Sequence, residues 1–198
     1  MIAAPRIEPV TLTGRLARLE PLGPDHVPGL AEVALDPAIW EWMFVRPASA
    51  ADVQAWAEAA LAAREAGTEM PFATVDVATG RPVGSTRFMN IALEHRRVEI
   101  GWTWLAPGWQ RTGINREAKL LLLGHAFEVL GCRRVEFKTD ARNERSREAL
   151  LGIGATFEGI FRNHMVLPDG RMRDSAWYSV IDAEWPAVRA ALEASLAR

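Results

Sequence analysis

Apolar and polar residues alternate along the chain with two different periods. A period of two, or a short apolar run, predicts strands over residues 16–22, 72–77, 82–91, 97–105, 134–140, 156–167 and 173–181. A wider apolar stripe with capping residues predicts helices over residues 25–35, from Ser49 or Asp52 to Gly67, over 114–130 and 143–153, and from Trp185 onward. Because several strands follow one another as hairpins, this order predicts a mixed α/β (α+β) sandwich and not a doubly wound sheet.

The length and continuity of the chain bound its domain organisation. A chain of 198 residues suits one domain with a sizeable core. No repeat, low-complexity tract or linker-like stretch divides it. We therefore expect a single domain over residues 1–198.

Composition narrows the class of protein but not its chemistry. Hydrophobic residues make up 49% of the chain and the formal net charge is −2, so nothing attracts it generally to nucleic acid or an anionic membrane. Apolar runs such as 120–123 are too short to cross a bilayer, and residues 1–5 lack the pattern of a secretory signal. The single cysteine, Cys132, excludes an internal disulfide and reads as a structural thiol. We expect a cytoplasmic protein with no membrane or nucleic-acid partner.

The segment 109–119 joins a strand to the long apolar helix through a short turn with one glycine, Gly113. The first amides of a helix lack internal acceptors and carry partial positive charge. Arg111, Arg116 and Lys119 add cations where most helices place an acid, so the turn is a candidate site for a phosphate or diphosphate. A solvated turn with surface arginines is the alternative.

The strand before this turn predicts a candidate base. Over residues 98–105, strict alternation places the large apolar side chains on one face and Glu99, Gly101 and Thr103 on the other. A glycine inside such a strand marks a bulge or the close approach of a ligand. A partly desolvated Glu99 would suit a general base, and the alternative is a solvent-facing Glu99 opposite an arginine.

A third segment, residues 140–147, carries a helix start with an unusual serine. Asn143 is the expected N-cap, which places Ser146 at the third helical position. A capping box would have Glu or Gln there, so the serine hydroxyl is left for another partner. The alternative is a capped surface helix with an incidental serine.

Four ordered segments carry a family resemblance: Gln110-Arg111-Thr112-Gly113-Ile114-Asn115, 140–146, 154–159 and 178–185. They resemble the GNAT superfamily of acetyltransferases, and within it the RimJ/RimL-like branch of ribosomal-protein N-acetyltransferases. The first is similar to the family's Q/R-x-x-G-x-G/A coenzyme A loop, with Asn115 in place of Gly or Ala, a variant of this branch. The resemblance as a whole extends over nearly the whole chain.

This resemblance implies a GNAT (acyl-CoA N-acyltransferase) fold, in which a mostly antiparallel sheet, flanked by helices, splays after its fourth strand. It implies acetyl-CoA as co-substrate, and no pair of side chains has the spacing of metal ligands. The implied coenzyme-binding residues are Trp102, Thr103, Trp104 and Leu105 along the pantetheine arm, Gln110, Arg111, Thr112, Gly113, Ile114 and Asn115 at the diphosphate, Asn143 beside the arm and Ser146 near the sulfur.

The implied reaction is direct attack of a primary amine on the thioester in a ternary complex. Glu99 would receive the amine proton through water, and Ser146 would donate to the departing thiolate. The N-terminal helices bring Trp40, Glu41 and Trp42 as candidates for binding the amine, and the alternative for the tryptophans is packing in the core. The amine is a protein N-terminus, an amino acid, a polyamine or an amine antibiotic. The alternative function is a non-catalytic coenzyme A-binding regulator on the same fold, and homodimers are common in this branch.

Overall fold

The computed structural model describes residues 7–197. Its elements are, in chain order, β1 (Leu12–Thr13), β2 (Ala17–Pro21), α1 (Val27–Val33), α2 (Ala50–Glu65), β3 (Met70–Asp76), β4 (Pro82–Ala92), β5 (Arg97–Leu105), α3 (Ile114–Gly124), β6 (Arg134–Asp140), α4 (Glu144–Gly152), β7 (Thr156–Val166), β8 (Met172–Ile181) and α5 (Trp185–Leu196). From β2 onward this order confirms the predicted succession of strands and helices, and the short strand β1 was not predicted. Within the described range, none of the helices has the length and apolar character needed to span a bilayer.

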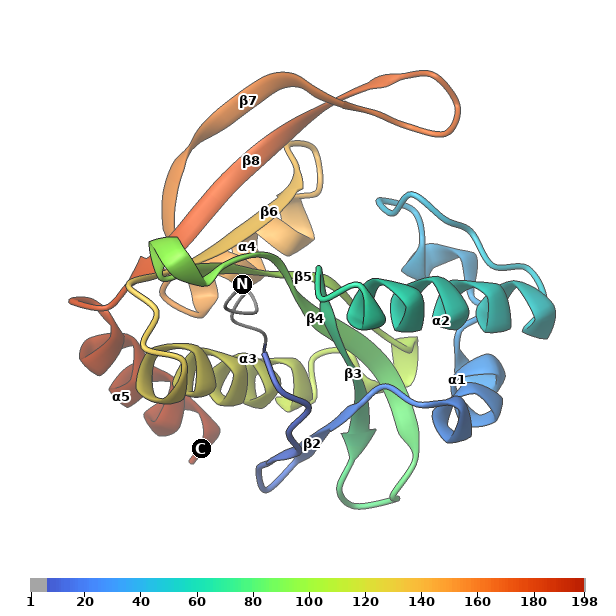
Figure 1. The fold of residues 1–198 in the computed structure, drawn as a ribbon, viewed down its shortest axis with the longest axis horizontal. Coiled ribbons are helices and arrows are strands. Elements are labelled where there is room, and N and C mark those ends of the chain that lie inside the picture. The colour runs from blue at the N-terminus through green and yellow to red at the C-terminus, as the bar shows by residue number, and fades with distance from the viewer. Residues whose placement is uncertain (1–6, 198) are drawn as a thin grey trace, which may run out of the picture.

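The strands form one sheet in the order β1-β2-β3-β4-β5-β6-β8-β7. Every neighbouring pair is antiparallel except β5 and β6, which run parallel and pair only from Arg97 to Glu99 and from Arg134 to Glu136. Beyond Glu99 the two halves of the sheet turn away from each other (Figure 1). The predicted mixed, mostly antiparallel and splayed sheet is confirmed.

Helices cover the two faces of the sheet unequally. The main core includes Leu122 of α3, Leu150 of α4 and Val188 of α5, which lie against one face. Leu30 of α1 and Trp56 of α2 form a second core on the opposite face of the β2–β5 half. On that second face the β6–β8–β7 half carries no helix, and β7 and β8 rise as a long hairpin opposite α2 (Figure 1).

Two predicted helices differ in their details. Asp25 does not cap the first, because a 3-10 turn over Pro24–His26 precedes α1, which begins at Val27. The predicted helix over 114–130 is α-helical only to Gly124 and continues as a π-helical turn, His125–Val129. Capping signals at Ser49 and Asn143 were read correctly, since each side chain accepts a hydrogen bond from a backbone N–H in the first helical turn.

Candidate active site

A β-bulge marks the place where the sheet splays. Arg87 of β4 pairs with Gly101, but Ser85, two residues earlier, pairs with Trp104, so β5 carries one extra residue. Trp102 lies at the bulge and has a φ of 50°, in the left-handed region. A Cβ at Gly101 would lie 2.5 Å from Sδ of Met89, so a larger residue there would require the Met89 side chain to move.

The bulge overturns the predicted alternation of β5. Trp104 packs in the core under α1 and α2, whereas Thr103 accepts a hydrogen bond from Lys119 of α3 on the other face. Val98 and Ile100 also lie in the core on the α3 side, which places Glu99 on the face of Trp104. The prediction that Glu99 points away from the tryptophans, together with Thr103, was wrong because the extra residue reverses the period of two.

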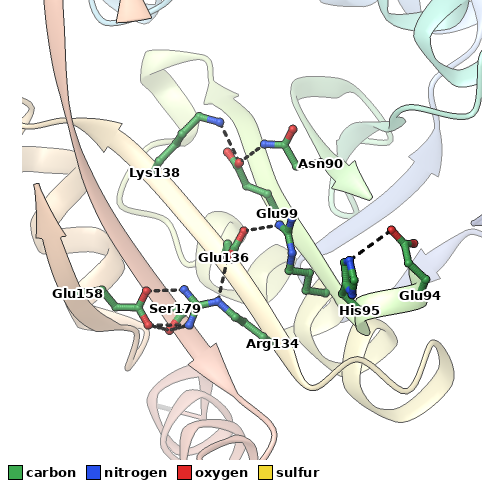
Figure 2. Close-up of polar contacts among 10 residues, drawn as sticks. Asn90, Glu94, His95, Glu99, Arg134, Glu136, Lys138, Glu158 and Ser179 are labelled. Atoms are coloured by element: carbon green, nitrogen blue, oxygen red, sulfur yellow. Dashed lines mark hydrogen bonds and ion pairs between the residues drawn. The ribbon is translucent and has the colours of Figure 1, made fainter. Parts of the chain in front are cut away.

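Glu99 is a buried, hydrogen-bonded carboxylate. Its side chain is 1% exposed, and Oε2 accepts hydrogen bonds from Nδ2 of Asn90 at 2.6 Å and from Nζ of Lys138 at 2.8 Å (Figure 2). The ammonium of Lys138 also lies 5.4 Å from the ring centre of Trp177. The solvent-facing alternative for Glu99 was therefore wrong, and its partner is a lysine on β6 rather than an arginine.

Glu99 stands at the end of a row of ion pairs on the helix-free face. Glu136 accepts from Arg97 at 3.0 Å and from Arg134 at 2.8 Å. Arg134 also pairs with Glu158 of β7 (Figure 2). These pairs and the Glu99–Lys138 pair link β5 to β6 and β6 to β7. Glu99 is the last member of the row before the strands part.

The loop before α3 keeps an open helix end. Gly113, with a φ of 90°, is the N-cap of α3, and no side chain of the described residues caps it. A Cβ there would lie 3.0 Å from Cδ1 of Leu16. The side chain of Thr112 donates back to the carbonyl of Trp109 at 2.7 Å, which fixes the turn. The first amides of α3 are therefore available to an anion.

The predicted diphosphate-binding residues differ in their exposure. Arg111 and Thr112 are exposed, Asn115 is partly exposed, and Ile114 is buried. Nε2 of Gln110 donates to the carbonyl of Leu105 at 2.9 Å, so this carbonyl is already engaged within the chain. The polypeptide places all of these residues at one end of α3.

The charges of the first turn of α3 were only partly anticipated. Arg116 is exposed, but Lys119 is 4% exposed and donates to the hydroxyl of Thr103 at 2.6 Å. Burial lowers the pKa of Lys119 to about 7. Lys119 therefore lies under the sheet, and the prediction that it adds a cation at the open helix end was wrong.

Sequence reasoning missed an acid in that same turn. The buried carboxylate of Glu117 accepts hydrogen bonds from the backbone N–H groups of Arg15 at 3.0 Å, Leu16 at 2.6 Å and Ala17 at 2.6 Å. Glu117 thus links α3 to the start of β2 and does not cap the first amides of α3. Its position one turn into the helix was the available signal.

The start of α4 lies across the splay from this loop. Oδ1 of Asn143 accepts from the backbone N–H of Ser146 at 3.0 Å, which confirms the predicted cap. Among residues 7–197 the Ser146 hydroxyl has no hydrogen-bond partner, and its residue is partly exposed. Nη1 of Arg145 donates to Oε1 of Gln110 at 3.2 Å. This contact joins α4 to the loop before α3, so the predicted coenzyme residues come together from both halves of the sheet.

Two arginines near the start of α4, Arg142 and Arg147, are hydrogen-bonded to other side chains. Nε of Arg147 donates to the hydroxyl of Tyr178 at 3.0 Å, and Tyr178 is 1% exposed in the main core. Asp140 is engaged by Arg142. Burial raises the pKa of Asp140, but its hydrogen bonds with Arg142 outweigh this and leave the pKa below its ordinary value. Tyr178 is therefore a core residue whose hydroxyl is hydrogen-bonded to Arg147.

The three residues predicted to bind the acceptor amine differ in their burial and contacts. Trp40 is fully buried, donates from Nε1 to the carbonyl of Ala34 at 2.6 Å and lies 5.2 Å from Trp104 between ring centres. The prediction that Trp40 lines an amine pocket was wrong, because the ring fills the core under α1 and α2. Glu41 is exposed, and Trp42 is partly exposed beneath the guanidinium of Arg142 at 5.4 Å.

The segment after Trp42 contributes an aromatic residue that the sequence reading missed. Phe44 lies 6.4 Å from Trp102 between ring centres. The guanidinium of Arg173, from β8, lies over the Phe44 ring, 5.4 Å from its centre. The guanidinium of Arg87 also lies over the ring of Trp102, 4.8 Å from the ring centre. Arg87 and Trp102 also line a cavity of about 590 Å³ beside α2. The face that carries Glu99 is thus lined by alternating aromatic and cationic groups.

Cys132 and His164 are two further side chains with reactive groups. Cys132 is buried, and burial raises the pKa of its thiol to about 11, as expected of a structural thiol. His164 shares a hydrogen bond with Ser175 at 3.0 Å. Across residues 7–197 there is no cluster of three or more His, Cys, Asp or Glu side chains that could hold a metal ion.

Comparison with known proteins adds independent findings. The family model described as "Acetyltransferase (GNAT) domain" matches residues 17–156. The uncharacterized N-acetyltransferase YoaA of Bacillus subtilis (strain 168) is 31% identical over 99 residues, which are 50% of this chain and 55% of YoaA. The match thus spans about half the length of this curated relative.

Solved structures extend the similarity to nearly the whole chain. A GCN5-related N-acetyltransferase from Brucella melitensis superposes with a TM-score of 0.91 at 36% identity, over 97% of this chain and 87% of that one. Mycobacterium smegmatis RimJ in complex with CoA-disulfide superposes with a TM-score of 0.80 at 23% identity, over 94% of this chain and 95% of that one. The second likeness shows a shared fold.

Proposed function

We propose a function from one premise: this chain belongs to the GNAT acetyltransferase family. The protein transfers an acetyl group from acetyl-CoA to a primary amine, by direct attack of the amine on the thioester while both substrates are bound. The observation that carries this proposal is the open N-terminus of α3 at Gly113, placed beside the splay of the sheet and linked to α4 through Arg145 and Gln110.

The donor site follows from this arrangement. The first amides of α3 would hold the diphosphate, with the exposed Arg111 beside them. Beyond Glu99 the backbone of β5 has no strand on its β6 side, so the pantetheine arm would lie along residues 102–104 in place of a strand. Asn143 would meet the arm with the amide N–H₂ group that its capping contact leaves available.

The reacting groups would lie at the bulge. Backbone N–H groups of β5 near Trp102 would stabilise the negative charge that develops on the thioester oxygen. Glu99, on the same face as the tryptophans, would receive the proton of the attacking amine through water. The hydroxyl of Ser146, which has no partner among the described residues, would donate a hydrogen bond to the departing thiolate.

An α-amine is the favoured acceptor. Its pKa of about 8 leaves a useful neutral fraction at neutral pH, whereas a lysine amine near 10.4 is almost wholly protonated. Protein N-termini, the substrates of the RimJ/RimL-like branch that the sequence resembles, meet this condition.

One observation favours a second function, a non-catalytic coenzyme A-binding regulator. Both Lys138 and Asn90 already donate to the carboxylate of Glu99, as they would to a purely structural ion pair. Two measurements separate the functions. Acetyl-CoA should raise the melting temperature under either one, but only an acetyltransferase releases thiol when amines are added. Stabilisation without thiol release on a broad amine panel would favour the regulator.

A further inference from the structure

Arg173 on β8 is a buried cation without a counter-ion of its own. Its side chain is 5% exposed, and Nε has no hydrogen-bond partner. No hydrogen bond or ion pair joins its guanidinium to any residue in the range 7–197; its contact is with the ring of Phe44 at 5.4 Å. Burial lowers the pKa of Arg173, against the charges of Asp140 and Glu99, which raise it. A buried charge left unpaired is unfavourable, so such a group calls for an anion.

The two carboxylates whose charges act on Arg173 are committed to other donors. Asp140 accepts from the backbone N–H, Nε and Nη2 of Arg142. Glu99 accepts from Lys138 and Asn90. With Lys138 and Arg142 matched to these two acids, the charge of Arg173 remains in excess at this face of the sheet.

A second buried donor lies on the same face of β8. Tyr178 and Ala176 point into the main core, so the alternate residues Arg173, Ser175 and Trp177 face the other way. Nε1 of Trp177 is buried and lacks a hydrogen-bond partner in the part of the chain that the structure describes. Ser175 between them is bound to His164. One strand face therefore offers two unpaired donors and no unpaired carboxylate.

These donors lie next to the proposed reaction centre. The ring of Phe44 that carries Arg173 also packs against Trp102, at the bulge where β5 leaves β6. Lys138, which holds Glu99, lies over the ring of Trp177. A ligand that reaches Glu99 on this face thus lies among Arg173, Trp177 and Lys138.

We propose that the acceptor amine carries a carboxylate close to its amino group and that Arg173 binds this carboxylate, with Nε1 of Trp177 as a further donor. The inference rests on the proposed acetyl transfer and names its substrate class. A guanidinium binds a carboxylate through two parallel N–H···O bonds, which fixes its orientation as well as its position. A polyamine would instead bring further positive charge to a face that already has it in excess. The carboxylate comes from a free amino acid or from an acidic residue at the start of a peptide.

Matched acceptor pairs test the inference in the thiol-release assay. One arm compares α-amino acids with their α-amides, and a second compares peptides that begin with Asp or Glu with those that begin with Asn or Gln. In at least one arm the carboxylate member should have a KM lower by about tenfold, the contribution of one charge-assisted contact. The arm that discriminates identifies the source of the carboxylate.

Two variants assign the effect to the residue. Arg173→Gln should raise the KM of the carboxylate member by about tenfold, with little change in kcat and little change for the amide member. Arg171→Gln, an exposed arginine of the same hairpin that pairs with Asp169, should change neither. Melting curves show whether each variant is folded, and the matched pairs decide the question in the unaltered protein even if Arg173→Gln is not.

The outcomes separate the two levels of the proposal. Equal KM values for both members of every pair, or an equal loss of both in Arg173→Gln, would overturn the carboxylate inference while acetyl transfer stands. A complete absence of thiol release with every amine would overturn the proposed function, and the inference with it.

Discussion

Oε2 of Glu99 lies 2.8 Å from Nζ of Lys138, so the candidate base is one half of a buried ion pair. Hydrogen bonds from Lys138 and Asn90 fix this carboxylate in place, as a group that receives a proton through water needs to be fixed. The same contact would also serve a structural residue. Activity measurements on variants therefore have to distinguish the two roles.

Glu99→Gln should lower kcat by about 10²-fold with little effect on the affinity for acetyl-CoA, because it removes proton acceptance at the reaction centre. Steady-state kinetics with a good amine acceptor measures both. The matched control is Glu136→Gln, another buried glutamate in the same row of ion pairs, which should leave kcat largely unchanged. Equal losses in the two variants would assign Glu99 to structure.

Gly113→Ala should weaken acetyl-CoA binding by about tenfold, because a left-handed alanine is strained by about 1 kcal/mol and would displace the amides of the loop. Titration calorimetry gives the dissociation constant. Gly170→Ala carries the same kind of strain, at a φ of 81°, in the β7–β8 turn, and should leave binding unchanged. Matching affinities in the two variants would argue against an anion site at Gly113.

The stability of the protein should depend on pH through Lys119. Its pKa is about 7 in the folded protein, and about 10.4 in an unfolded chain. Between these values the unfolded state binds more protons than the native state, so stability rises with pH. Below about pH 7 the full cost of burying the charged amine is present.

Lys119→Met should abolish this dependence. From about pH 7 to about pH 9 the unaltered protein should gain about 2 kcal/mol in unfolding free energy relative to the variant. Urea denaturation across this range measures the difference. Parallel stability profiles of the two proteins would show that Lys119 does not titrate in this window.

Glu117→Ala should lower the unfolding free energy by about 3 kcal/mol, because it leaves three backbone N–H groups at the start of β2 without their acceptor. Denaturant unfolding provides the value. The exposed Glu148 of α4 is the control, and Glu148→Ala should change stability by less than about 0.5 kcal/mol. A loss below about 1 kcal/mol in Glu117→Ala would mean that these amides find water instead.

Local signals were sufficient to predict most of the elements. The side chains of Ser49 and Asn143 each cap a helix within its first turn, so the nearby sequence is enough to predict where the helix begins. The strand β6 covers the predicted residues 134–140. The loop around Gly113 was equally readable, since its glycine and missing cap are properties of neighbouring residues. Features of this kind depend on contacts a few residues apart.

The lining of the site depends on long-range contacts that no local pattern encodes. The bulge at Trp102 reverses the faces of β5, and only the pairing with β4 reveals it. Lys119 and Trp40 were read as site residues but are buried beneath elements far away in the sequence. Arg173 becomes a candidate only when Phe44, more than a hundred residues earlier, packs against it.

Hydrogen exchange with saturating acetyl-CoA tests the central claim, that the first amides of α3 hold the diphosphate. The amides of residues 111–116 should exchange slower by about tenfold or more when the coenzyme is bound, since each donates to the ligand rather than to water. Unchanged exchange in this segment, at a coenzyme concentration that saturates binding, would contradict the account.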